Sequence, residues 1–264
     1  MGAFPTLVLA ATARLIRHPL VPAALALSAA WSLIPAVRDS SLMASAPGTP
    51  LNVFLVLTHV PSMPLGVAVL FAANLLATRD RRAGTAELLA AVPVPLRRRT
   101  AAALLAVLAP AVLTGCFTAV QMIIFHRYGP QPARWPSLGE LAVQPATVLG
   151  GGLLGVAVAR LAPWPGAAAA TLAGLVGAFT LPASAGRQEL LSLAPWREMA
   201  VQDDAGVVSY LPGSPGWHAA YLCCLGGLAA IAALLATPGP RRHLLLSAAV
   251  AVTATVVTGC AQFG

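Results

Sequence analysis

The chain concentrates its charge in one short stretch. Six of its sixteen basic residues, all arginines, lie between positions 79 and 99, around a polar centre flanked by long apolar runs. Within it, Thr85 suits the N-cap of a helix, Glu87 suits the positive end of the helix dipole, and Pro93 ends a helix. The stretch therefore predicts a short helix over 85–92 that offers a contact to another protein.

The side chains that commonly perform catalysis are few and scattered. The five histidines show no metal-ligand spacing, and the sequence holds no HExxH motif and no paired carboxylates. His59, Asn74 and Gln121 are the main polar side chains within the apolar runs, and they lie on different runs. A membrane enzyme normally sets ionisable groups opposite one another inside the bilayer. We therefore expect no catalytic residue, no metal and no cofactor.

The chain contains no lysine at all. A Walker loop needs a lysine to reach the phosphates of a nucleotide, so this chain is not expected to bind ATP itself. The apolar runs also lack the midplane carboxylate that proton- and sodium-coupled carriers generally use. If the protein does ATP-driven work, a separate polypeptide must supply the hydrolysis.

The overall composition places these residues in a membrane protein. The 264 residues are 58% hydrophobic and only 9% charged, with a mean hydropathy of +0.80, whereas a soluble domain carries about 25% charged residues. Most of the charge-free runs reach the roughly 20 residues that a helix needs to cross a bilayer. The expected spans are 19–37, 54–77, 101–125, 142–159, 164–182, 217–236 and 244–262. The four cysteines lie in apolar runs without metal-like spacing, and we expect them to be buried.

The arginines predict the orientation of these spans. If the N-terminus is cytoplasmic and the spans alternate, eleven arginines fall inside and five outside, which follows the positive-inside rule. The net charge of +8 could indicate a nucleic-acid partner, but the arginines flank apolar runs. That placement indicates contact with the lipid bilayer and no nucleic acid. We therefore expect a multi-pass protein of the cell membrane with its N-terminus in the cytoplasm.

Segments outside the spans carry further expectations. Residues 6–18 predict an amphipathic helix whose Arg14 and Arg17 anchor it at the lipid headgroups. An alternative is that the N-terminal region is a signal peptide cleaved near 44–46, although the apolar stretch is long for one. In the loop 183–216 we expect a short surface helix around 190–197. The Gly-rich start of the fourth span, including Gly151 and Gly155, predicts close helix packing.

The polar stretch resembles a loop found in a known family. In the permease subunits of ABC exporters that handle drugs, polysaccharides and lipids, the loop after the second span looks like E-R-E-x-G-T-x-E-L-L-x-x-x-P. This chain has D-R-R-A-G-T-A-E-L-L-A-A-V-P at 80–93. The residues that match are Gly84, Thr85, Glu87, Leu88, Leu89 and Pro93, with Asp80 as a conservative replacement. Arg82 replaces an acidic residue that is usual in the family.

The resemblance implies an architecture and partners. The segment 79–99 would carry a cytoplasmic coupling helix that docks in a groove on a separate ATPase subunit, and 6–18 would be the connecting helix of the family. A second permease, the same chain or a sister chain, would complete the path. The family has six spans, so the run 244–262 would be an additional C-terminal helix in a single permease domain, 1–264. Arg97, Arg98 and Arg99 would anchor the third span at the inner headgroups.

The fold class expected from these observations is all-α, a polytopic transmembrane helical bundle. The leading hypothesis is the permease subunit of an ATP-driven exporter, with a hydrophobic drug, natural product or lipid as the substrate that the resemblance implies. One alternative is a non-transporting membrane scaffold or sensor whose basic loop binds anionic lipid. A membrane-embedded enzyme is disfavoured because the spans lack catalytic groups.

Overall fold

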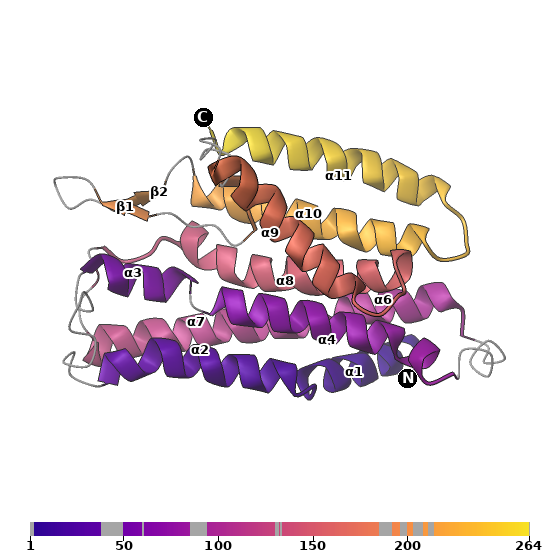
Figure 1. Ribbon diagram of the computed structural model, residues 1–264, viewed down its shortest axis with the longest axis horizontal. Helices are drawn as coiled ribbons and strands as arrows, with labels where there is room; N and C mark the ends of the chain where they lie inside the picture. The colour runs from indigo at the N-terminus through magenta and orange to yellow at the C-terminus, as the bar shows by residue number, and fades with distance from the viewer. Residues whose placement is uncertain are drawn as a thin grey trace.

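The computed structural model is a bundle in which most helices run along one common axis, and α9 crosses the others obliquely (Figure 1). It describes residues 3–37, 50–59, 61–84, 94–129, 132, 134–184, 192–195, 200–202, 208–210 and 214–263. The helices are α1 (Ala3–Ile16), α2 (Leu20–Val37), α3 (Pro50–His59), α4 (Ser62–Arg82), α6 (Leu96–Ala106), α7 (Leu108–Tyr128), α8 (Leu138–Leu161), α9 (Ala167–Ser184), α10 (Pro215–Leu235) and α11 (Arg242–Ala261). The helical class expected from the sequence is confirmed.

Five helical stretches among the described residues are long and apolar enough to cross a membrane. They are Val56–Arg82, Leu96–Tyr128, Leu138–Leu161, Pro215–Leu235 and Arg242–Ala261. The expected spans at 19–37 and 164–182 are also helical, as α2 and α9, but their apolar described parts are shorter. The count of six core spans and a seventh therefore stays a prediction.

Two breaks in the long helices lie at or near a proline. Pro61 lies between α3 and α4 and occupies the N-cap position of α4. Pro110 has no N–H to donate to the carbonyl of Ala106, four residues earlier. The break between α6 and α7 falls one residue after Ala106, at Val107. Both breaks therefore have a local cause in the backbone chemistry of proline.

Helix α8 lies at the centre of the bundle and packs against α4, α7 and α10. Its glycines permit this close packing, because a Cβ on Gly151 would lie only 2.7 Å from the carbonyl oxygen of Gly66 in α4. A Cβ on Gly155 would collide with the carbonyl of Leu70, one turn further along α4. The glycine pair therefore packs two helices of the same chain, as the sequence predicts.

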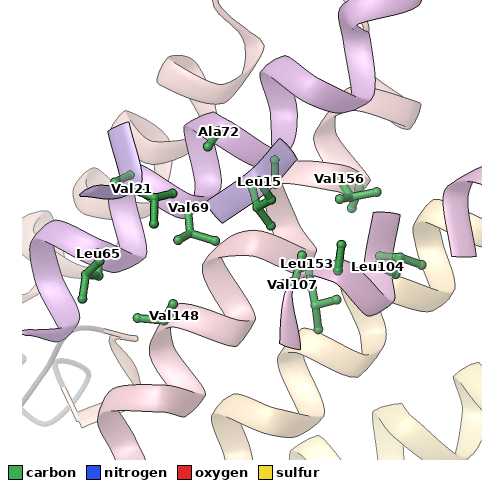
Figure 2. Close-up of a cluster of buried hydrophobic side chains, with 14 of the residues drawn as sticks. Leu15, Val21, Leu65, Val69, Ala72, Leu104, Val107, Val148, Leu153 and Val156 are labelled. Carbon is green, nitrogen blue, oxygen red and sulfur yellow. The ribbon is translucent and has the colours of Figure 1, made fainter. Parts of the chain in front are cut away.

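The main apolar core lies between α8 and the helices around it. Figure 2 shows Leu104 and Val107 beside Leu153 and Val156 of α8. Leu15, near the end of α1, is 2% exposed and belongs to the same cluster. The N-terminal helix is therefore anchored in the bundle by its apolar face.

The segment between α9 and α10 differs from the expectation. It contains a two-stranded antiparallel hairpin of β1 (Ala200–Gln202) and β2 (Val208–Tyr210). Within the surface helix expected at 190–197, the described residues 192–195 form a short 3₁₀ turn and a bend, and the other residues lie outside the described ranges. The surface helix expected at 190–197 therefore stays a prediction.

The cysteines are less buried than expected. Cys116, Cys223 and Cys260 are exposed on the surfaces of α7, α10 and α11, and Cys224 is half-buried. The expectation of burial inside the protein is wrong for the three exposed residues. A transmembrane helix needs apolar side chains on its outer surface as well as on its inner face, so an apolar run does not distinguish the two positions.

Candidate functional site

One end of the bundle gathers most of the described arginines, and we call it the basic end. Figure 1 shows the last turns of α4, α8 and α10 at the same end as the first turns of α6 and α11. The arginines of the basic end are Arg79, Arg81, Arg82, Arg97, Arg98, Arg99, Arg160, Arg241 and Arg242. The polar stretch expected to contact another protein begins and ends here.

Gly84 lies directly after the C-cap residue of α4, Ala83. Its φ of +67° is a left-handed conformation that favours glycine. The preceding backbone N–H, on Ala83, donates to the carbonyl of Arg79 over 2.9 Å. The expected docking residues Thr85, Glu87, Leu88, Leu89 and Pro93 lie outside the described residues. The short helix over 85–92 therefore stays a prediction.

Asp80, another expected docking residue, forms an ion pair with Arg99. The pair joins the last turns of α4 to the first turn of α6. The Asp80 side chain is 45% exposed and the Arg99 side chain 24% exposed. The ion pair therefore ties together the two helices that flank the segment 85–93, within reach of solvent.

The beginning of α6 is also tied to the connection between α10 and α11. The guanidinium of Arg97 donates to the carbonyl of Pro240 over 2.9 Å. Gly239 has a φ of +146°, and a Cβ there would lie 2.8 Å from Nη1 of Arg97. Three arginines are expected to anchor the third span. Arg97 and Arg99 form bonds within the protein, to the carbonyl of Pro240 and to Asp80, and Arg98 is exposed.

Helix α1 presents the other expected anchoring residues. Arg14 and Arg17 are exposed, whereas Leu15 between them is buried. α1 packs along α6 and also contacts α4. The role of these two arginines as membrane anchors stays a prediction.

The opposite end of the bundle holds buried amides that sequence reasoning did not bring together. Nε2 of Gln144 in α8 donates to the carbonyl of Leu57, and Oε1 of Gln144 accepts from the Thr118 hydroxyl over 3.1 Å. Nε2 of Gln121 donates to the carbonyl of Val56 over 3.2 Å. Pro61 has no N–H to donate to the Leu57 carbonyl, which explains why a side chain must bond it.

The same end contains a closed carboxylate site. Glu140 is 1% exposed, and its carboxylate accepts from both terminal nitrogens of Arg134. Ser137 and Glu140 also form a capping box at the start of α8. The guanidinium of Arg134 lies 4.6 Å from the centre of the Phe54 ring. The S-x-x-E spacing at 137–140 is a signal that could have revealed this cap.

No group of three or more histidine, cysteine, aspartate or glutamate side chains is placed to hold a metal ion within the described part of the chain. Comparison with protein-family models, with curated proteins and with solved structures finds no match for this chain. The class that the fold and the site define is a helical bundle that has, among its described residues, five helices long and apolar enough to cross a membrane and a cluster of arginines at one end.

Proposed function

We propose that the chain is the membrane-spanning permease subunit of an ATP-driven ABC exporter of the cell membrane. It would bind a separate ATPase subunit through the segment 84–93 and pair with a second permease, the same chain or a sister chain. Its N-terminus and its basic end would face the cytoplasm, in line with the positive-inside rule.

The observation that supports this proposal most is the position of the G-T-x-E-L-L-x-x-x-P sequence. It follows α4 directly, starts at the left-handed Gly84, and lies between two helices joined by the ion pair of Asp80 and Arg99. A segment with both ends fixed in this way transmits a push to α4 and α6 together. Such coupling is what an exporter needs when ATP is hydrolysed on another chain.

The packing of the bundle offers a route from this segment into the spans. α4 and α8 approach at Gly151 and Gly155 so closely that neither position has room for a side chain. Asn74 of α4 adds a hydrogen bond of 3.3 Å from Nδ2 to the carbonyl of Gly155. Because packed helices move as rigid elements, a displacement of α4 would carry α8 with it. The proposed outcome is a change in the path between two permeases.

Co-purification tests the proposed partner. The full chain carries an affinity tag, is extracted from its own cells in a mild detergent, and is analysed by mass spectrometry for a protein with a Walker loop. We expect Glu87→Arg to reduce recovery of this ATPase at least tenfold, because the charge reversal opposes the predicted docking helix. Glu198→Arg makes the same charge change outside the docking segment and is expected to leave recovery unchanged. Equal recovery with both variants would refute the docking proposal.

A lipid-binding scaffold or sensor is the second candidate, and the surplus of arginines at the basic end favours it. The two candidates differ in what the segment 84–93 must do. Scrambling these ten residues removes no arginine. A scaffold would keep its function after the scramble, whereas an exporter would lose export of its substrate and recovery of its ATPase.

A further inference from the structure

Helix α11 is the least covered of the five described stretches that could cross a membrane. Only 6% of its apolar stretch is buried within the protein, against 50% for α8. It packs along α10 at the edge of the bundle (Figure 1). Its half-buried positions include Ala248, Ala251 and Ala254. Larger apolar side chains are exposed instead and form what we call the α11 face: Leu245, Leu246, Val250, Val252, Val256 and Val257. Helix contacts in membranes favour small residues, so the α11 face suits lipid tails better than another helix.

The α11 face begins with positive charge. Arg242 is exposed and precedes Leu246 by four positions and Val250 by eight, so the three lie on the same side of the helix. Arg241, the residue before it, is exposed as well. From Arg242 to Val256 the helix rises about 21 Å, which is more than half of the ~30 Å hydrocarbon core of a bilayer. One surface therefore offers exposed cations followed by apolar side chains over the depth of one leaflet.

The start of α6 adds positive charge at the same place. The Arg97 guanidinium donates over 2.9 Å to the carbonyl of Pro240, which directly precedes the two exposed arginines of α11. Arg98, next to Arg97, is exposed. Asp80 is the one carboxylate that the structure describes at the basic end, and it is paired with Arg99. The exposed arginines at the start of α6 and α11 are therefore open to an anion from outside the chain.

We propose that the start of α11 and the α11 face together bind one anionic phospholipid. The guanidiniums of Arg241 and Arg242 donate to the headgroup phosphate, Arg98 adds positive charge, and the tails lie along the α11 face. A neutral lipid would cover the apolar part but gain less from the arginines. A soluble anion would reach the arginines but leave the apolar part uncovered. Only a molecule with an anionic head and apolar tails matches both parts. The proposal holds for an exporter and for a scaffold alike.

The test measures retention of phosphatidylglycerol by the purified full chain. The protein is held in an uncharged detergent, titrated with phosphatidylglycerol or phosphatidylcholine, and analysed by native mass spectrometry. We expect one phosphatidylglycerol molecule to be retained about tenfold more strongly than phosphatidylcholine. The double variant Arg241→Gln and Arg242→Gln should weaken phosphatidylglycerol retention about tenfold and leave phosphatidylcholine retention unchanged. The double variant Leu246→Ala and Val250→Ala should weaken retention of both lipids about threefold, because apolar contact is lost.

The matched control is the double variant Arg81→Gln and Arg82→Gln, which removes the same charge from exposed positions of α4 at the same end. Helices α8 and α10 separate α4 from α11 (Figure 1). We therefore expect an effect of about twofold at most, through a screened long-range field. Equal weakening by the two arginine double variants, or equal retention of the two lipids by the wild type, would overturn the proposal. A dimer of the chain that Leu246→Ala with Val250→Ala dissociates would also overturn it, since a second copy would then cover the α11 face.

Discussion

The two ends of the bundle each contain an ion pair between an arginine and a carboxylate, but in contrasting surroundings. At the opposite end, Glu140 is 1% exposed and is bonded by Arg134 and by the backbone N–H of Ser137. At the basic end, Asp80 is 45% exposed and shares its surroundings with several arginines besides its partner Arg99. The Glu140 site is closed to solvent, whereas the Asp80 site is accessible and has an excess of positive charge.

The difference indicates a division of roles within one fold. The opposite end uses its polar groups to satisfy the start of α8 and the carbonyls freed at the break between α3 and α4. Those bonds stabilise the protein itself, and Oε1 of Gln121 and Nε2 of Gln262 at this end are buried without a hydrogen-bond partner among the described residues. The basic end keeps Arg98, Arg241 and Arg242 exposed, and none of them is paired with a carboxylate in the described part of the chain. We therefore expect partners to bind at the basic end, and we expect the polar groups of the opposite end to stabilise the fold.

Among the substitutions that test this contrast, Glu140→Ala is expected to lower the free energy of unfolding most. The substitution removes the capping box of α8 and leaves Arg134 without its carboxylate, so we expect a loss of about 3 kcal/mol in the free energy of unfolding. Thermal or denaturant unfolding in detergent measures it, with Asp80→Ala as the matched loss of a carboxylate. A loss for Glu140→Ala no larger than for Asp80→Ala would remove the distinction between the two ends.

A smaller loss is expected for Gln144→Leu at the same end. The leucine fills a similar volume but leaves the carbonyl of Leu57 and the hydroxyl of Thr118 without this partner, which costs about 1–2 kcal/mol. The control is Thr180→Val, because the Thr180 hydroxyl bonds only within α9 and is exposed. Unfolding of both variants in the same detergent gives the comparison. If Gln144→Leu is as stable as the control, the buried amides contribute nothing to the closed end.

The sequence predicts features of this protein that depend on local chemistry. The apolar runs predict where the helices lie, Pro61 and Pro110 predict the breaks, and Gly84 predicts the end of α4, because each acts on its own turn of backbone. The capping box at 137–140 is equally local and could have been read. These signals cover nearly all of the helical fold.

Features that depend on distant residues could not be predicted in this way. Gln144 bonds the carbonyl of Leu57, 87 positions away, and nothing in either segment specifies the other. The bond from Arg97 to the carbonyl of Pro240 joins positions 143 apart. The hairpin of β1 and β2 has strands of three residues, too short to show an alternating pattern. The grouping of Arg98 with Arg241 and Arg242 depends on the bond of Arg97 and has no signal in sequence.

The smallest expected loss of stability belongs to Asp80→Asn at the basic end. The same variant should retain anionic lipid more strongly than the wild type does. The ion pair with Arg99 is solvent-accessible, so its loss should cost about 0.5 kcal/mol in unfolding free energy. The variant also removes the one carboxylate that the structure describes at the basic end, which should strengthen retention of phosphatidylglycerol about twofold. Unfolding with and without this lipid measures both effects on one sample. A variant that unfolds as easily as Glu140→Ala, or that retains less lipid than wild type, would show that Asp80 closes its site as Glu140 does.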